Sequence, residues 1–174
     1  MKRIFALLLC LVLTLGFAAC GNADGNGTEN NKDNGKNENK AGVSFYVNCS
    51  GVKIELGADA TALMAQLGTP ASQSEMGACG DLGTVTKYVY EAIELYVLKN
   101  GDKATVDQIT LKNDLTKTPE GIKIGSTKDE VLAACGKGYA KCDDSEIRYT
   151  DGNKNLKFTL RDGNVIAINY LVLS

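Results

Sequence analysis

Histidine and tryptophan are absent from this chain of 174 residues, and proline occurs only twice. Without histidine, the protein lacks the commonest general base, the usual catalytic triads and a frequent ligand of zinc. The net charge of −2 also argues against nucleic acid as a partner, because proteins that bind nucleic acid present a basic surface. These absences favour a binding role over catalysis.

The N-terminus has the pattern of a bacterial export signal. Residues 1–3 are positively charged at two positions, and residues 4–15 are almost entirely apolar. That stretch is shorter than the roughly 20 residues that span a membrane. Small residues then precede Cys20, which predicts a signal peptide over residues 1–19. An ordinary signal peptide cut after Ala19, with no lipid attached, is the alternative.

The segment before Cys20 resembles the lipobox of bacterial lipoproteins, in which the cysteine receives a diacylglycerol and becomes the mature N-terminus. This resemblance implies lipid attachment at Cys20 and a location on the outer side of the cell membrane. Residues 20–42 are rich in Asn, Gly and alternating charges, so we expect a disordered tether. A folded domain is expected over residues 43–174.

The folded part contains an internal duplication. Residues 54–68 align without gaps with residues 122–136, and both segments predict a short strand, a glycine turn, a helix and a glycine stop. Thr127 and Glu130 have capping-box spacing at the start of the second helix. Gly68 and Gly136 suit the left-handed position that ends a helix.

Alternating apolar residues follow each helix, with Asn-Gly and Asp-Gly turns between them, and predict antiparallel strands. A further hairpin, residues 45–47 with 52–56, opens the domain. The predicted class is α+β, with two tandem helix-plus-antiparallel-sheet repeats, residues 43–118 and 119–174, in one domain. The predicted strands after the helices are 84–90, 93–99 and 104–111, then 145–150, 154–160 and 164–172.

The helix-to-glycine units, the entry Gly121-Ile-Lys-Ile-Gly125 and the strand Tyr88-Val-Tyr90 after Cys79 resemble a group of Gram-positive lipoproteins. Those proteins look like tandem copies of the β-lactamase inhibitory protein fold, which is similar to the SmpA/OmlA lipoprotein domain. The resemblance covers about residues 50–174. It implies that the sheet face away from the helices would hold a protein partner.

Four cysteines remain in the predicted mature chain: Cys49, Cys79, Cys135 and Cys142. Outside the cell, an even number of cysteines indicates disulfides first. We expect Cys49–Cys79 and Cys135–Cys142, because each pair lies within one repeat. Free buried thiols and a four-cysteine zinc site are the alternatives, and zinc is disfavoured because no C-x-x-C spacing occurs. The resembled inhibitor also carries paired cysteines in its repeats.

Two acidic segments have the residue types of a site but lack the full pattern. Residues 151–162 begin like a calcium loop, but Leu156 stands where that loop needs glycine and Asp162 replaces the bidentate glutamate. Residues 143–146 cluster three acids in a polar loop, where acids are usually just solvated. We therefore predict no catalytic residue, no metal site and no cofactor.

The predicted strand alternation gives the two repeats different outer faces. Tyr90 with Tyr149, Tyr96 with Phe158 and Leu98 with Leu160 are expected to face the helices. The opposite face of the second repeat is polar, with Glu146, Arg148, Thr150, Lys157, Thr159 and Asn169. In the first repeat that face is largely apolar, with Lys87, Val89, Ile93, Leu95, Val97 and Val106. Either the N-terminal hairpin or a partner should cover this apolar face.

The function expected from these features is a lipid-anchored, extracytoplasmic binding module without catalysis. Its partner would be a protein or peptide of the cell envelope, and its interaction face would be Val89, Ile93, Leu95, Val97 and Val106. An exported hydrolase that uses Asp or Glu is one alternative. An envelope receptor for a small ligand, bound in a cavity between the repeats, is another.

Overall fold

The structure, a computed structural model, describes residues 42–77 and 83–173. These residues belong to a unit that spans residues 37–174. The predicted signal peptide, Cys20 and Cys79 lie outside the described residues, as does the tether except Gly42, so those predictions stand as predictions. No helix within the described ranges is long and apolar enough to cross a membrane.

The described residues form two short helices and ten strands, so the class is α+β with sheet predominating. The helices are α1 (Ala60–Leu67) and α2 (Lys128–Cys135). The first strands are β1 (Tyr46–Cys49), β2 (Val52–Glu55), β3 (Ser72–Gly77), β4 (Thr84–Val89), β5 (Ile93–Asn100) and β6 (Lys103–Leu111). The later strands are β7 (Lys141–Cys142), β8 (Glu146–Asp151), β9 (Lys154–Arg161) and β10 (Asn164–Val172). The six strands predicted after the helices, which are β4–β6 and β8–β10, are confirmed within about one residue, whereas β3 and β7 were not predicted.

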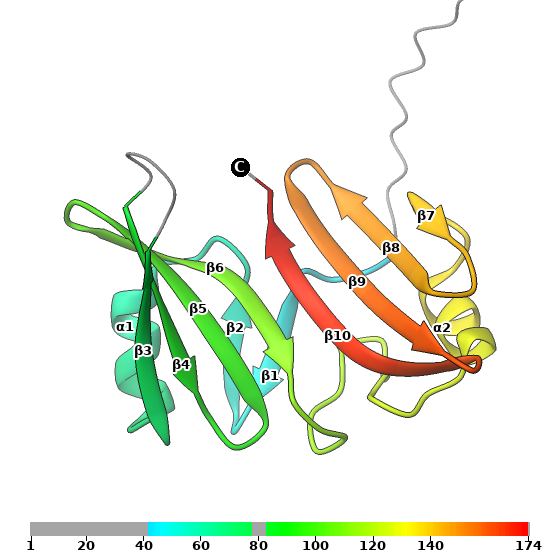
Figure 1. The fold of residues 1–174 in the computed structure, drawn as a ribbon, viewed down its shortest axis with the longest axis horizontal. Helices are drawn as coiled ribbons and strands as arrows, with labels where there is room; N and C mark the ends of the chain where they lie inside the picture. The colour runs from blue at the N-terminus through cyan, green and yellow to red at the C-terminus, as the bar shows by residue number, and fades with distance from the viewer. Residues whose placement is uncertain (1–41, 78–82, 174) are drawn as a thin grey trace, which may run out of the picture. The chain divides into compact units, whose positions relative to one another are not determined.

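Eight of the strands make one antiparallel sheet in the order β3-β4-β5-β6-β10-β9-β8-β7 (Figure 1). Strands β1 and β2 pair with each other as a separate hairpin, as predicted. The first four strands of this order and the last four meet in the middle of the sheet, where β6 pairs with β10 and Leu111 stands opposite Ile168. Each helix is followed in the chain by four strands that occupy one end of this sheet.

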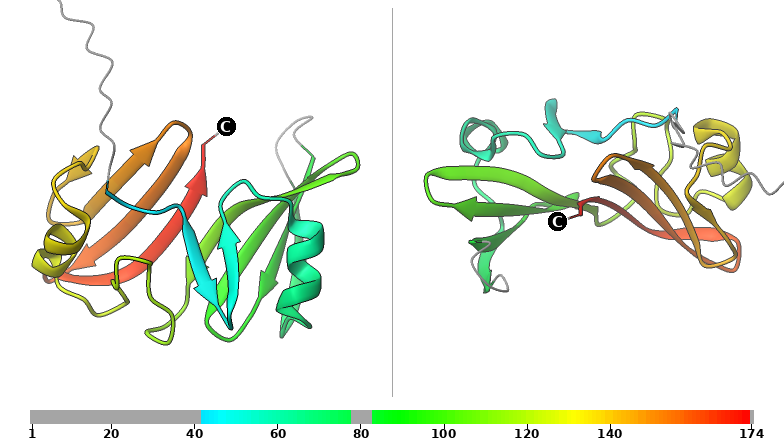
Figure 2. Two further views of the ribbon diagram at one scale, coloured as in Figure 1. Left: turned by 180° about the vertical axis from the view of Figure 1, so that it is seen from behind. Right: turned by 90° about the horizontal axis from the view of Figure 1, so that it is seen from above.

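Both helices and the β1–β2 hairpin lie on the same face of the large sheet (Figure 2). The core fills the space between them. Its largest fully buried side chains include Tyr149, Tyr170, Phe158, Leu95 and Ile54. The opposite face of the sheet is covered by no helix or strand among the described residues, and we call it the open face.

The predicted helix ends are confirmed. The Thr127 hydroxyl accepts the backbone N–H of Glu130 at 3.2 Å, and the Glu130 carboxylate accepts the backbone N–H of Thr127 at 2.7 Å. Gly68 and Gly136, which follow the two helices, both have φ of 74°, where glycine is strongly favoured. These short helices are therefore bounded by local interactions as well as by core packing.

The short strand predicted before α2 is wrong. Residues 122–124 form no strand, because their backbone groups are used inside the loop. The Thr118 N–H donates to the Ile122 carbonyl at 2.8 Å, and the Ile122 N–H donates to the Thr118 hydroxyl at 3.3 Å. The matching segment before α1 is a strand because Ile54 pairs with Val47 of the hairpin.

Candidate functional site: the open face of the sheet

The predicted apolar interaction face is wrong for four of its five residues. Ile93, Leu95, Val97 and Val106 are buried in the core, between 0% and 5% exposed. Val89 lies on the open face, where it pairs across the strands with Glu94. These four apolar residues therefore help to form the hydrophobic core and are not available to bind a partner.

The error is a slip of one residue in the assumed register of β5. Tyr88, which contacts the core, stands opposite Leu95 and not opposite Tyr96. The β5–β6 loop is Gly101–Asp102, whereas the aligned β9–β10 loop is Asp162–Gly163, one position earlier in the alignment. A slip of one residue moves every side chain of a strand to the other face. Tyr96 and Leu98 consequently lie on the open face.

The hairpin and the chain that follows it cover the core face of this half. The Gly57 N–H donates to the Val106 carbonyl at 2.7 Å, and the Val106 N–H donates to the Ala58 carbonyl at 2.9 Å. Ile54 and Leu56 are buried in the same hydrophobic cluster as Leu95. Of the two coverings expected for these apolar residues, the structure supports the hairpin.

The open face carries polar and aromatic side chains in rows that cross the strands. One row follows the cross-strand pairs Val89, Glu94, Thr110, Asn169, Lys157, Arg148 and Lys141. The next row is Lys87, Tyr96, Gln108, Leu171, Asn155 and Thr150. The polar residues predicted for the outer face of the second half are thus confirmed outside the core.

The first half of the open face is internally satisfied. The Glu94 carboxylate accepts the Tyr96 hydroxyl at 3.0 Å and the Lys87 ammonium at 3.2 Å. Partial burial opposes ionisation, but these two donors hold the pKa of Glu94 below its usual range. Burial and the hydrogen bond to Glu94 raise the pKa of Tyr96. Each charged group in this cluster has a partner.

Hydrogen bonds continue across the middle of the open face. The Gln108 amide donates to the Thr110 hydroxyl at 3.0 Å, and that hydroxyl donates to the Asn169 carbonyl oxygen at 2.9 Å. These hydrogen bonds link β6 to β10, the two strands at which the halves of the sheet join. It gives the centre of the open face a fixed polar surface.

The second half of the open face is cationic. Arg148 and Lys157 stand directly opposite each other in the β8–β9 pair. Glu146 lies beside this pair, with one oxygen 3.5 Å from Arg148 Nε and the other 3.7 Å from Lys141 Nζ. Within residues 42–77 and 83–173, no carboxylate lies within ion-pairing distance of Lys157.

Asn155 sits in this half with an unsatisfied donor. Its side chain is 2% exposed, and its carbonyl oxygen accepts the Thr150 hydroxyl at 3.2 Å. Its amide nitrogen is buried without a hydrogen-bond partner. Such a group costs free energy unless a ligand or a water molecule satisfies it.

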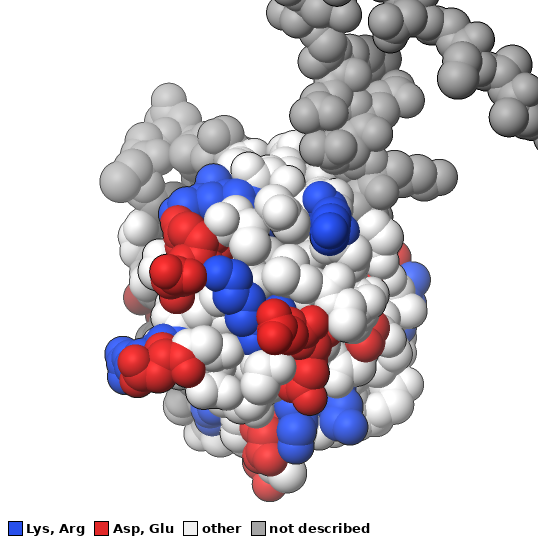
Figure 3. Space-filling view, turned by 90° about the vertical axis from the view of Figure 1, so that its right-hand side faces the viewer, with Lys and Arg blue, Asp and Glu red and all other residues white. Residues whose placement is uncertain are grey.

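The acidic cluster at residues 143–146 forms a structured turn. The Asp143 carboxylate accepts the Ser145 hydroxyl and the backbone N–H groups of Ser145 and Glu146, at 2.7–2.8 Å. These bonds, together with Lys141, hold the pKa of Asp143 well below its usual range. Figure 3 shows Lys and Arg interspersed with Asp and Glu on this side of the molecule. The cluster is therefore a polar turn with local ion pairs.

The segment that imitates a calcium loop runs from Asp151 at the end of β8 through the turn Gly152–Asn153 and strand β9 to Asp162 in the β9–β10 loop. No group of three or more His, Cys, Asp or Glu residues that could hold a metal ion occurs within the described ranges.

The cysteine prediction is contradicted where the structure describes it. Cys135 and Cys142 are free thiols, so the expected Cys135–Cys142 bond is not formed, and Cys49 is also free. Cys135 is buried at the end of α2, and burial raises its pKa to about 12. A thiol held protonated inside the core is a weak nucleophile and a poor partner for disulfide exchange. Cys79, the other half of Cys49–Cys79, lies outside the described residues.

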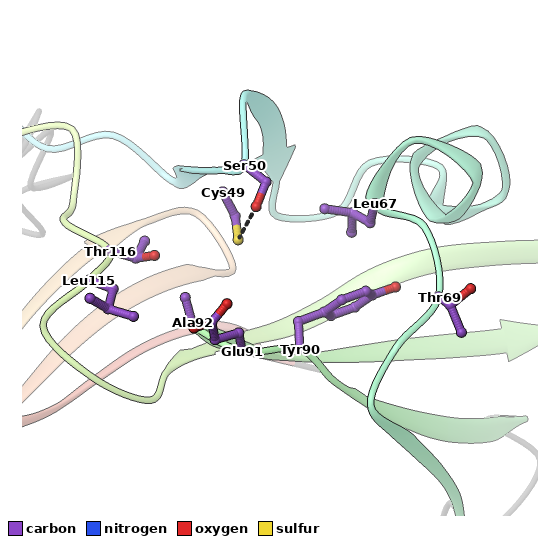
Figure 4. Close-up of a pocket in the computed structure, with 9 residues that line it drawn as sticks. All are labelled: Cys49, Ser50, Leu67, Thr69, Tyr90, Glu91, Ala92, Leu115 and Thr116. Atoms are coloured by element: carbon purple, nitrogen blue, oxygen red, sulfur yellow. Dashed lines mark hydrogen bonds between the residues drawn. The ribbon is translucent and has the colours of Figure 1, made fainter.

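A cavity of about 380 Å³ opens beside the hairpin turn, the end of α1 and the β4–β5 loop (Figure 4). Its lining residues are Cys49, Ser50, Leu67, Thr69, Tyr90, Glu91, Ala92, Leu115 and Thr116. Burial raises the pKa of Tyr90, whose hydroxyl lies 3.8 Å from the Met64 sulfur. The lining comes wholly from residues 49–116, so this is not the predicted cavity between the two repeats.

Comparison with protein families finds no match, and comparison with curated proteins finds none either. Among solved structures, the chain is similar to an extracellular protein containing an SCP domain from Bacillus anthracis str. Ames. The identity is 17% and the TM-score is 0.40, and the match covers 67% of this chain and 44% of that protein. The chain thus spans less than half of that protein, and similarity at this level defines neither a fold nor a function.

Proposed function

We propose that this protein is a lipid-anchored binding module on the outer side of the cell membrane, and that the open face holds a protein or peptide partner. The observation that carries the proposal is the bare sheet face. Both helices and the hairpin cover one side of the sheet (Figure 2). Rows of polar and aromatic residues cross the strands on the other side. A sheet face without a described cover but with fixed hydrogen bonds is suited to recognition.

The finer description of the fold belongs to the same proposal. We propose that the domain is a tandem pair of units resembling the β-lactamase inhibitory protein. The support is the matched order of elements, since each helix is followed by four strands and ends in a glycine with φ of 74°. In the resembled inhibitor, the partner is held on the sheet face away from the helices, which is the open face here.

A second candidate function is supported by one observation. The cavity beside Tyr90 is of a size that suits a small ligand, and hydroxyl groups, a thiol and Leu67 line it. A receptor for a small polar molecule would use this cavity. Saturable ligand-induced stabilisation of the wild type, abolished by Ala92→Trp, would support the receptor over the binding module.

Site-specific photo-cross-linking tests the principal proposal. A photoreactive phenylalanine replaces Gln108, at the centre of the open face, in the full chain expressed in a Gram-positive host. Gln66, exposed on α1, provides the matched control position. The proposal predicts a discrete cross-linked product from position 108 and none of that mass from position 66. Equal labelling at both positions, or no product at position 108, contradicts it.

The anchor is tested separately by Cys20→Ala. Loss of the acyl chains, which supply about 0.8 kcal/mol per buried methylene, should abolish lipid labelling and release the protein from the membrane fraction. Unchanged membrane retention of the variant would contradict lipid attachment at Cys20.

A further inference from the structure

The cationic pair on the open face is unfavourable in the protein alone. Arg148 and Lys157 stand directly opposite each other in an antiparallel pair, an arrangement that destabilises a sheet when the charges are alike. Glu146 compensates Arg148, and the first half of the face shows that this fold can pair its cations, as Lys87 does with Glu94. Lys157 has no such carboxylate within the described ranges.

Two amides extend this row of donors. Asn169 stands opposite Lys157, and its carbonyl oxygen is already engaged by Thr110. Asn155, two residues before Lys157 on the same strand, buries an amide nitrogen with no acceptor. Donors from β8, β9 and β10 therefore lie in two neighbouring rows of the open face. Among the described residues, Lys157 has no carboxylate within ion-pairing distance and the Asn155 amide nitrogen has no acceptor.

We propose that this part of the open face, formed by Arg148, Lys157, Asn155 and Asn169, binds an acidic segment of the partner protein. The proposal rests on the binding role of the open face and specifies the chemistry of the partner. Carboxylates would accept hydrogen bonds from the ammonium, the guanidinium and the two amides, and would separate the opposed cations.

The spacing of the donors favours a peptide over a single small anion. Neighbouring strands lie about 4.8 Å apart, so donors on three strands extend across about 10 Å. Carboxylates at alternate positions of an extended chain are about 6.7 Å apart on one side. Two acidic side chains of one segment can therefore reach this row together, which one inorganic anion cannot.

The first arm of the test needs no ligand. Lys157→Gln removes the opposed charge, so the variant should melt about 1–4 °C above the wild type in low-salt buffer without multivalent anions. Lys137→Gln, an exposed lysine after α2, is the matched control and should leave the melting temperature unchanged. A Lys157→Gln variant that melts at or below the wild type would overturn the claim that Lys157 lacks a partner.

The second arm measures binding of a fluorescein-labelled ten-residue peptide that alternates Glu and Thr, with a Gln-Thr peptide as control. The wild type should bind the Glu peptide at least about tenfold more tightly than the Gln peptide, and Lys157→Gln should lose about tenfold in affinity. Lys137→Gln should bind as the wild type does. Equal losses in both variants, or no preference for the Glu peptide, would overturn the proposal.

Vesicles of phosphatidylglycerol provide the competing polyanion. If the vesicles bind through Lys157 as tightly as the Glu peptide does, the site binds anionic surfaces in general and the proposal fails. Failure of the acidic-partner proposal can be distinguished from failure of the binding role of the open face. A cross-link from position 108 that persists in Lys157→Gln, with no preference for the Glu peptide, would retain the open face as a binding surface and reject its acidic partner.

Discussion

The two halves of the open face solve the same problem of placing charges on a sheet in opposite ways. Over β4 and β5, Lys87, Glu94 and Tyr96 satisfy one another within 3.2 Å. Over β8 and β9, Arg148 stands opposite Lys157, and the amide nitrogen of Asn155 has no acceptor. The hydrogen bonds and ion pairs of the first half are therefore satisfied within the protein, whereas the second half has donors left over that a partner could satisfy.

The two halves also differ in how their cores are closed. The first half is closed by the hairpin, where Ile54 is buried, and by the residues after it, since Gly57 and Ala58 form backbone hydrogen bonds with Val106 of β6. The second half closes with α2 and the loop that precedes it, where Ile122 is buried.

The largest effect should come from placing a charge on the core face. Leu95→Lys buries an ammonium at a site with 0% exposure, which should cost at least about 3 kcal/mol of unfolding free energy. Leu98→Lys makes the same change three residues later on the open face and should cost less than about 1 kcal/mol. Urea denaturation of the two variants measures the difference, and similar midpoints would contradict the assigned register.

The next largest effect on stability should distinguish the two aligned tyrosines, Tyr149 and Tyr90. The buried Tyr149 hydroxyl donates to the Gly136 carbonyl at 2.8 Å and ties the end of α2 to β8. Tyr149→Phe should therefore cost about 1–1.5 kcal/mol. Tyr90→Phe removes only a contact of 3.8 Å to the Met64 sulfur and should cost less than about 0.5 kcal/mol. Chemical denaturation checks both, and a larger loss for Tyr90→Phe would reverse the comparison.

The helix caps provide a third contrast. Thr127 and Glu130 form a full capping box on α2, whereas Asp59 caps α1 through one bond to the Thr61 N–H at 2.7 Å. Thr127→Ala should cost about 1 kcal/mol, and Asp59→Ala about 0.5–1 kcal/mol. Circular dichroism melts of both variants measure this. No loss for Thr127→Ala would show that packing alone holds α2.

The smallest effect concerns acid stability. Because the pKa of Asp143 is lowered on folding, its contribution is fully present above the unfolded value of about 3.9 and is lost as the pH falls further. Asp143→Asn should therefore lose less melting temperature than the wild type between about pH 4 and pH 2. Parallel slopes for the two proteins in that window would contradict the role of the turn.

Local patterns predicted most of the elements. The capping box, the glycine stops and the two-residue turns depend on neighbours in the chain, so the helix at residues 127–136 and the strands β4–β6 and β8–β10 could be predicted, whereas β3 and β7 were missed. Which side chains of β5 face the core could not be predicted, because this depends on a strand register that the position of Gly101 shifts by one residue. Because of that single shift, the prediction placed Leu95 on the open face and Tyr96 in the core, whereas Leu95 is buried and Tyr96 is half-buried on the open face.

The open face itself was harder to predict. Its polar half was visible from Arg148, Lys157 and Asn169, since these alternate with apolar residues. That Lys157 and the Asn155 amide lack partners could not be predicted, because it depends on cross-strand neighbours that are distant in the chain. Thr110 and Asn169, for example, are 59 positions apart. The thiols show the same limit. Pairing within a repeat was plausible for Cys135 and Cys142, but the burial of Cys135 in the core was not visible in the spacing.

Filling the centre of the open face with a large side chain tests whether this face holds the partner. Thr110→Trp places a large side chain between β5 and β10, on the face that no described element covers, and should leave the melting temperature within a few degrees of the wild type. Recovery of the partner identified by cross-linking at position 108 is then measured with wild type, Thr110→Trp and the control Gln66→Trp on α1. We expect at least a tenfold loss of that partner for Thr110→Trp and none for Gln66→Trp. Undiminished recovery by a correctly folded Thr110→Trp variant would contradict it.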